Sequence, residues 1–304
     1  MLRLVPANTS INFVKLRYIM FLLSTFIVLG SLAGFMMNGL NYGIDFRGGF
    51  LIEIRTPEIA DLSGLRTKLS GLDLGDVKLQ GFGSDTRDVM IRIERQPGGE
   101  KAQSIALNKI RQALGKDVTY RRVETVGPKV SEDLKRKGLM AIGFALLAML
   151  VYIWFRFEWQ FGFCAIVALT HDCTSIIGLY AFLPCLEFNE TAIIAILTTA
   201  GYSINDTVVI YDRIRENLRK YKKESMPEII NRSINNTLSR TVLTSVTTLL
   251  ALFALYFFGG NVIATFSLPI IVGITVGTYS SLCLSSLLLL YFKLGGEDRK
   301  QGAA

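Results

Sequence analysis

Residues 191–210, TAIIAILTTAGYSINDTVVI, form an apolar stretch that contains a single carboxylate, Asp206. A helix of about 20 residues crosses the hydrocarbon of a bilayer, so this stretch has the length and composition of a membrane span. Arg240 stands where the next long apolar stretch begins. Because a charged side chain in hydrocarbon costs roughly 2.5–3.5 kcal/mol, such residues usually face a polar interior or one another and mark an ion or proton path. The sequence therefore predicts a membrane protein that uses charge inside the bilayer.

Apolar runs long enough to span a bilayer recur along the whole chain. The first exceeds the apolar core of a secretory signal, about 7–15 residues, so we interpret it as a retained anchor. The last is longer than one span requires, which indicates tilt, a bend near Pro269 or continuation past the membrane surface. The six runs cover residues 18–37, 138–155, 161–184, 191–210, 241–258 and 262–292.

The distribution of basic residues predicts the orientation, because Lys and Arg near helix ends stay in the cytoplasm. The segment 211–239 is rich in them, whereas the loops around 187–190 and 259–260 have none. We therefore expect residues 1–17, 211–239 and 293–304 to be cytoplasmic and residues 38–137 to form an exported domain. The basic residues that decide this are Arg213, Arg215, Arg219, Lys220, Lys222, Lys223 and Arg232.

Composition argues against several other classes of protein. The net charge is +8, but the basic residues are spread between loops and the exported domain, so the chain has no nucleic-acid channel and at most a surface for anionic lipids. Cys164, Cys173 and Cys283 fall in spans and Cys185 in a short outer loop, so no disulfide is expected. The sequence contains neither a nucleotide-binding motif nor a nucleophile constellation, and we expect neither a metal, nor a cofactor, nor an enzyme.

The exported domain has alternating strand and helix periodicities. Strand patterns cover 50–55, 77–82, 89–93 and 118–126, and helical spacing covers 58–69, through Ile59, and 102–114, through Ile105. The order βαββαβ predicts a ferredoxin-like α+β domain, with two helices on one face of an antiparallel sheet.

Polar residues inside the spans form the candidate functional site. Thr199, Tyr202 and Asp206 are spaced i, i+3 and i+7 and share one helical face, beside Asn205. We interpret Asp206 and Arg240 as a proton-transfer pair, the alternatives being a structural ion pair or an arginine that snorkels to the interface. Thr244 and Thr247 on the following span extend this candidate polar pathway.

A second carboxylate, Asp172, lies near the middle of the third run beside His171, the only histidine. Both join the candidate pathway, although His171 could equally serve only to hydrogen-bond a neighbouring helix. One histidine and one carboxylate are too few ligands for a metal site.

Two glycine patterns predict local structure. The segment 41–49, NYGIDFRGG, reads as a structured turn at the membrane exit, in which Gly48 and Gly49 permit positive φ and Asp45 could cap nearby amides. The turn motif comprises Gly43, Asp45, Phe46, Gly48 and Gly49. In the last run Gly273, Gly277, Ser281 and Ser285 recur every four residues, which predicts close helix packing.

Three of these segments carry a family resemblance. The segments 201–216, GYSINDTVVIYDRIRE, and 239–248, SRTVLTSVTT, together with the glycine turn, closely resemble the SecD/SecF family of bacterial protein-export membrane proteins. Arg47 stands where a threonine is common in that family. The resemblance covers essentially the whole chain and implies six transmembrane helices of the resistance-nodulation-division type around one exported domain.

The same resemblance implies a function and partners. It implies an inner-membrane subunit that works with SecD, the SecYEG channel and YajC, contacts membrane lipids and unfolded exported polypeptides, and uses the proton-motive force. The alternatives are an exporter of small molecules or lipids with the same architecture, and a passive scaffold for the translocase.

Overall fold

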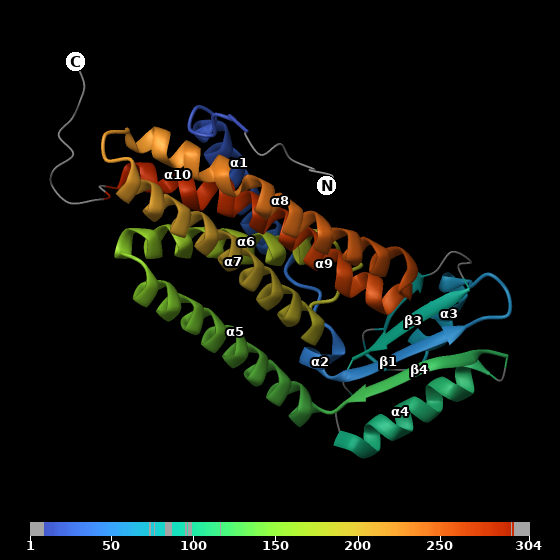
Figure 1. The fold of residues 1–304 in the computed structure, drawn as a ribbon. Helices are drawn as coiled ribbons and strands as arrows, with labels where there is room; N and C mark the ends of the chain where they lie inside the picture. The colour runs from blue at the N-terminus through green and yellow to red at the C-terminus, as the bar shows by residue number, and fades with distance from the viewer. Residues whose placement is uncertain are drawn as a thin grey trace. The chain divides into compact units, whose positions relative to one another are not determined.

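Among the residues that the structure describes, six helices are long and apolar enough to cross a membrane, which confirms the expected number of spans (Figure 1). The structure is a computed structural model that describes residues 9–72, 74–75, 77–82, 87–94, 96, 99–115, 117–292 and 294, so most of the expected cytoplasmic ends lie outside it. The spans are α1 (Arg17–Asn38), α5 (Pro128–Arg156), α6 (Trp159–Phe182), α7 (Glu190–Lys220), α8 (Met226–Phe258) and a last helix that begins with α9 (Gly260–Tyr279).

The last span changes its helical form without ending. After α9 it continues as a π-helical segment, η1 (Ser280–Ser285), then as α10 (Ser286–Leu288) and a 3-10 turn, η2 (Leu289–Tyr291). Pro269 lies inside α9, so the departure from α-helical form comes eleven residues later than the expected bend.

The segment 211–239 is mostly helical instead of forming a loop. α7 continues to Lys220, and α8 begins at Met226 behind a capping box in which Ser225 N donates to Glu228 Oε2 at 3.0 Å. Hydropathy marks where the apolar surface ends, and polar helix can continue beyond that point. The third apolar run is likewise longer than its helix, because α6 ends at Phe182.

The chain divides into a helical unit and an α+β unit, the latter formed by Asn41–Ala141 and Glu187–Thr191. The α+β unit has the expected order: β1 (Gly49–Arg55), α3 (Leu62–Ser70), β2 (Val77–Phe82), β3 (Asp88–Ile93), α4 (Gly99–Leu114) and β4 (Thr119–Val126). All pairings are antiparallel in the order β2-β3-β1-β4, which is the ferredoxin-like arrangement.

One face of this sheet forms the core of the α+β unit. Side chains of β1 and β3 pack with those of α3 and α4 in one cluster whose fully buried members are Ile52, Ile54, Leu69, Val89, Ile91, Ile93 and Ile110. Alternate residues of a strand point to one face, so the expected strand patterns placed these residues correctly.

Two expected core positions are wrong. Ile59 is 75% exposed, because it lies before α3, which begins only at Leu62. Asp61 is the N-cap of this helix, and its side chain accepts hydrogen bonds from the amides of Ser63 and Gly64, both at 3.0 Å. Ile105 is 58% exposed, and the buried stripe of α4 runs one residue later, through Ala106. A capped helix start overrode the apolar spacing in the first case.

In the helical unit small residues bring helices close together. α1 packs along α6, and a Cβ at Gly178 would collide with Ser31. The rings of Phe157, just before α6, and Phe161 of α6 pack against the fully buried Tyr211 of α7, with centroids 5.6 and 5.0 Å from that of Tyr211. These contacts fix α7 against the start of α6, close to the polar residues described next.

Candidate functional site

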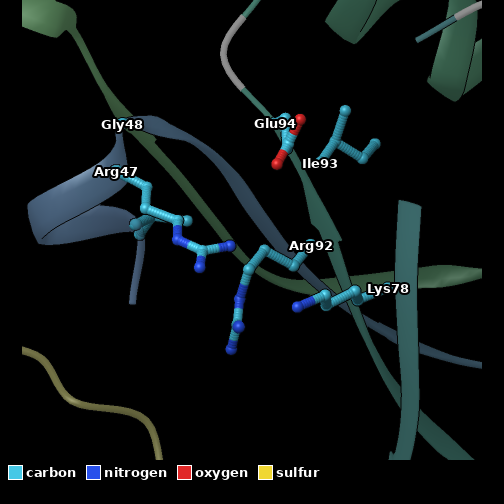
Figure 2. Close-up of a pocket in the computed structure, with 7 residues that line it drawn as sticks. Arg47, Gly48, Lys78, Arg92, Ile93 and Glu94 are labelled. Atoms are coloured by element: carbon cyan, nitrogen blue, oxygen red, sulfur yellow. The ribbon is translucent and has the colours of Figure 1, made fainter. Parts of the chain in front are cut away.

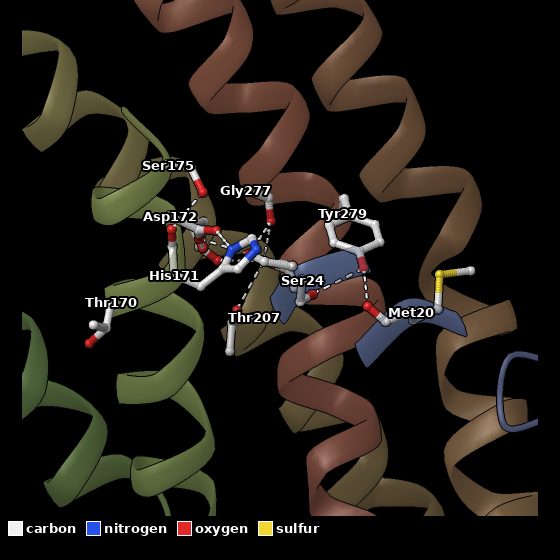
Figure 3. Close-up of polar contacts among 12 residues, drawn as sticks. Met20, Ser24, Thr170, His171, Asp172, Ser175, Thr207, Gly277 and Tyr279 are labelled. Atoms are coloured by element: carbon white, nitrogen blue, oxygen red, sulfur yellow. Dashed lines mark hydrogen bonds and ion pairs between the residues drawn. The ribbon is translucent and has the colours of Figure 1, made fainter. Parts of the chain in front are cut away.

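A fully buried carboxylate on α6, Asp172, lies at the centre of a polar network (Figure 3). Ser203 Oγ of α7 donates to Asp172 Oδ2 at 2.5 Å, and Ser280 Oγ of the last span donates to the same oxygen at 2.7 Å. His171 Nδ1 lies 2.9 Å from Oδ1. Three spans thus converge on one acidic group, and both of its oxygens are occupied.

The π-helical segment explains how two consecutive serines reach this network. Ser280 contacts Asp172, while Ser281 Oγ lies 2.9 Å from the carbonyl oxygen of Ser203. Ser286 Oγ donates to the Ser281 carbonyl at 2.8 Å, five residues back. A π-bulge adds a residue to a turn, so neighbouring side chains can face the same helix, and such bulges occur frequently at functional sites.

His171 connects the carboxylate to a second group of polar contacts. Its Nε2 is buried and has no hydrogen-bond partner in the described part of the chain, and its ring centroid lies 6.3 Å from that of Tyr279. Tyr279 OH donates to the carbonyl of Met20 at 2.6 Å and lies 3.0 Å from Ser24 Oγ, both on α1. The histidine therefore stands between the buried carboxylate and a polar contact to α1.

Asp206 of α7 lies beside this network without joining it. Asp206 is only 5% exposed, yet its carboxylate makes no hydrogen bond and no ion pair among the described residues. The residues that flank it on the helix do connect: Ser203 to Asp172, and Thr207 Oγ1 to Ser281 Oγ at 3.0 Å. Asp206 is consequently a buried carboxylate on a helix that hydrogen bonds fix on both sides of it, at Ser203 and at Thr207.

Arg240 lies on the exposed side of α8. No ion pair joins Arg240 to Asp206 within the described residues. A change in charge at Asp206 therefore does not require a salt bridge to break first.

The polar contacts of α8 with other helices are made by residues other than the expected Thr244 and Thr247. Thr244 and Thr247 are exposed, and their hydroxyls donate to carbonyls of their own helix. Two other residues connect α8 to neighbouring helices. Thr248 Oγ1 lies 2.8 Å from the hydroxyl oxygen of Tyr202 on α7, and Ser245 Oγ lies 2.7 Å from Thr278 Oγ1 on α9.

The remaining expected members of the pathway divide between the interior and the surface. Thr199 is 1% exposed and faces the last span, whereas Asn205 is exposed. A Cβ at Gly273 would collide with Thr199, and one at Gly277 would come within 3.2 Å of Ser203 Cβ. Ser285 Oγ donates to its own helix, at the carbonyl of Ser281.

The glycine turn has a defined conformation. Ile44–Arg47 forms one helical turn, α2, and Gly48 and Gly49 follow with φ of 75° and 123°, as the paired glycines predicted. Asp45 caps an amide far away in sequence, not a local one, because its Oδ2 accepts from Glu190 N at 3.4 Å.

Within the described residues no group of three or more His, Cys, Asp or Glu side chains could hold a metal ion, and all four cysteines are free. The polar site therefore consists of carboxylates, one imidazole and hydroxyl groups. Such groups can hold and relay protons.

Comparison with known proteins identifies the family. The model for "Protein export membrane protein SecD/SecF, C-terminal" matches residues 106–295, and that for the "SecD/SecF GG Motif" matches residues 34–56. The chain belongs to the SecD/SecF family. The second match contains the glycine turn, and the first contains the whole polar network except its contacts with α1.

Relatives named Protein translocase subunit SecF match over nearly their full length. The one from Rickettsia rickettsii is 46% identical over 296 residues, which are 96% of this chain and 94% of the relative. The one from Cereibacter sphaeroides is 41% identical over 306 residues, 98% of this chain and 93% of the relative.

Two solved structures share the fold. SecDF from Thermus thermophilus, described as a translocon-associated membrane protein, matches with a TM-score of 0.84 and 35% identity over 95% of this chain. SecDF in a super-membrane-facing form matches with a TM-score of 0.68 and 36% identity over 93% of this chain. The chain spans 39% of the length of each. It is accordingly a multi-pass inner-membrane protein of the resistance-nodulation-division type, with an accessory role in Sec-dependent protein translocation.

Proposed function

We propose that the protein works with SecD as a subunit that uses the proton-motive force to promote export of unfolded polypeptides through the SecYEG channel. The observation that carries the proposal is Asp206, a buried carboxylate in a membrane span with no hydrogen-bond or ion-pair partner among the described residues. A group in this position is costly to retain unless its charge is used. Moving one elementary charge across the membrane potential supplies about 2.3 kcal/mol per 100 mV.

In this mechanism Asp206 takes up and releases the proton, and Arg240 provides the charge that resets it. The neighbouring hydroxyls link a change at Asp206 to other spans, because Ser203 bonds to α6 and Thr207 to the last span. A change in the charge of Asp206 therefore acts on α7 between its contact with α6, at Ser203, and its contact with the last span, at Thr207. The protein does not act as an enzyme here, and the gradient supplies the energy.

The proposed topology follows from the basic residues. Both ends of the chain and the connection between α7 and α8 are cytoplasmic, and the α+β unit is exported, where it would meet polypeptides that leave the channel. YajC and anionic lipids are further proposed contacts.

The test compares proton-gradient-dependent export in membrane vesicles that carry Asp206→Asn, Arg240→Met, Arg240→Lys or the wild-type chain together with SecD. Asp206→Asn keeps the size of the side chain and removes its titration, so the gradient-dependent part of export should fall at least tenfold while assembly with SecD persists. Arg240→Met should reduce the same part of export. Arg240→Lys tests whether any positive charge is sufficient.

Asp212→Asn is a matched control, because Asp212 lies on the same helix but is exposed and paired with Arg156 at 2.8 Å. The double variant of Asp206 and Arg240 should be scarcely worse than either single one, since both serve one step. Unchanged export in Asp206→Asn vesicles would refute the mechanism and favour the passive scaffold. Gradient-driven efflux of a small molecule or lipid without a channel would favour the exporter.

A further inference from the structure

The glycine turn, residues 41–49, forms a clasp with residues 187–189, the end of the α6–α7 connection. Two backbone hydrogen bonds hold it: Phe188 N donates to Asn41 O at 2.8 Å, and Gly43 N donates to Phe188 O at 3.0 Å. They form a parallel bridge between Tyr42 and Phe188. Both halves belong to the α+β unit, although they are separated by about 140 residues of sequence.

The side chains of the clasp fit this backbone pairing. The Phe188 ring packs against Tyr42 edge-on at 5.9 Å and against Phe46 at 6.0 Å between centroids. A Cβ at Gly43 would lie 2.9 Å from the Cβ of Asn189 and 3.3 Å from Glu187 Oε2. Glycine is therefore required at position 43 because the connection approaches it closely, in addition to the positive φ that Gly48 and Gly49 provide.

A partly buried charge pair completes the clasp, with side chains 12% and 15% exposed. Glu187 pairs with Arg92 of β3, whose Nη1 also donates to Asn41 Oδ1 at 3.2 Å. Figure 2 shows the guanidinium groups of Arg47 and Arg92 next to each other, with Lys78 nearby. Burial and the like charge of Arg47 lower the pKa of Arg92 to about 10. Without Glu187 the partly buried guanidinium of Arg92 would lose the carboxylate that pairs with it.

The clasp continues directly into the helix that carries Asp206. α7 begins at Glu190, the residue after the clasp, and the amide of Glu190 is the one that Asp45 accepts from. An acidic side chain at a helix N-terminus is favourable because of the helix dipole. At 1.5 Å per residue, Asp206 lies about 24 Å further along the same helix. One end of α7 is thus held by the α+β unit, and its middle is held by Asp172.

We propose that the clasp is the coupling element that makes the α+β unit and α7 move as one body, with Glu187, Phe188 and Arg92 as positioning residues for gradient-driven export. This inference rests on the proposed function. A change in charge at Asp206 shifts α7, and the clasp transmits that shift to the α+β unit through backbone hydrogen bonds, packed aromatic rings and one ion pair. Covalent connection alone would leave a flexible joint at the α6–α7 connection.

The first test loosens the clasp. In the proposed complex with SecD, Phe188→Ala and Glu187→Gln should lower gradient-dependent export at least fivefold, with protein level and assembly unchanged. Glu58→Gln is the matched control for the charge, because Glu58 is an exposed residue of the same unit and lies outside the clasp. Wild-type export in both clasp variants would overturn the inference.

The second test locks the clasp and separates coupling from mere stability. Tyr42→Cys and Phe188→Cys, in a Cys185→Ser background, place two thiols at the bridge, where paired strands lie about 4.8 Å apart and a disulfide can form. Because both rings are lost, the reduced protein should export as poorly as Phe188→Ala. If coupling needs a closed clasp, oxidation should restore gradient-dependent export to within twofold of the Cys185→Ser parent. Oxidised protein that exports no better than the reduced protein would overturn coupling as one body.

A conformational readout completes the design. A fluorophore on Lys68→Cys, an exposed position of the α+β unit, should respond to an imposed proton gradient in a Cys185→Ser background and lose that response when Phe188→Ala is added. Asp206→Asn is measured in parallel. If Asp206→Asn abolishes gradient-dependent export but the clasp variants do not, only the clasp inference fails. If Asp206→Asn also exports normally, the proposed function itself fails.

Discussion

Removing the hydroxyl of Ser203 or Ser280, each of which donates to Asp172, should destabilise the helical unit by an amount that reveals whether the Asp172 carboxyl group is charged. Ser203→Ala and Ser280→Ala each delete one hydrogen bond to Oδ2, of 2.5 Å and 2.7 Å respectively, in a site where Asp172 is 0% exposed. Water cannot replace the lost donor without entering the helix contact. The substitutions also remove only one oxygen atom, so the cavity they leave is small.

The magnitude follows from the kind of hydrogen bond. A bond to a charged group contributes about 1.5–3 kcal/mol, and a bond between neutral groups about 0.5–1.5 kcal/mol. An ionised Asp172 therefore predicts a change of about 12- to 140-fold in the unfolding equilibrium for each variant, at about 1.4 kcal/mol per tenfold. A protonated Asp172 predicts a change below about 12-fold.

The measurement is the free energy of unfolding of the purified protein in detergent, from chemical denaturation of each variant. Ser267→Ala is the control, because Ser267 is equally buried but its hydroxyl bonds only to the carbonyl of Ile263 on its own helix. In a double-mutant cycle with Asp172→Asn, the serine effects should shrink by at least about half, as expected for groups in direct contact. Effects equal to that of Ser267→Ala, and additive with Asp172→Asn, would refute the network.

Three further predictions concern the α+β unit and the topology. Burial raises the pKa of Glu53 above its ordinary 4.5, so the folded state binds a proton at this carboxyl group more tightly than the unfolded state does. In the excised segment 41–126, the free energy of unfolding should therefore fall as the pH rises from 4.5 towards the folded pKa, and Glu53→Gln should abolish that fall. Asp61→Ala removes the cap of α3 and should lower the Tm of the same segment by about 4–8 °C, for a cost of about 1 kcal/mol measured by thermal melting. Exposed Cys185 should react with an impermeant thiol reagent from outside, and Lys223→Cys in a Cys185→Ser background only from the cytoplasm; reaction of both from one side would overturn the topology.

The architecture could be predicted from the sequence because it depends on periodicity and hydropathy. Each apolar run was longer than a soluble core helix needs, and the strand patterns of the α+β unit alternated clearly. The errors occurred where a single contact competes with a pattern. Ile59 has helical spacing, but the Asp61 cap starts the helix beyond it, and polar α7 and α8 continue where hydropathy indicated a loop.

The clasp could not be predicted from local sequence. The residues 41–49 show that glycines are needed, but the reason at Gly43 is the approach of Asn189, almost 150 residues later. No pattern in residues 187–189 identifies a partner. Backbone pairing of two irregular segments depends on the complete fold, and a single sequence contains little signal for it.

The polar network was predicted in part, and its missing members have a common physical cause. Asp172 and His171 were candidates because charge is rare in spans, and Ser203 could have been added, since it lies one turn before Asp206 on the same helix. Ser280 was missed because the four-residue spacing selects Gly277 and Ser281, and consecutive residues of a regular α-helix lie about 100° apart around its axis. The π-helical segment brings both serines to the same site.

The small residues of the last span therefore do more than let two helices pack. A Cβ added at Gly277 would lie 3.2 Å from Ser203 Cβ and 3.8 Å from Asp172 Oδ2, so a side chain there would occupy the space beside the shortest hydrogen bond of the network. The glycine brings the last span close enough for Ser280 to reach the same oxygen from the other side. Close packing and polar contact are then one requirement: the carboxylate can be buried only because the helices approach closely, and the close approach is useful because hydroxyl groups line it.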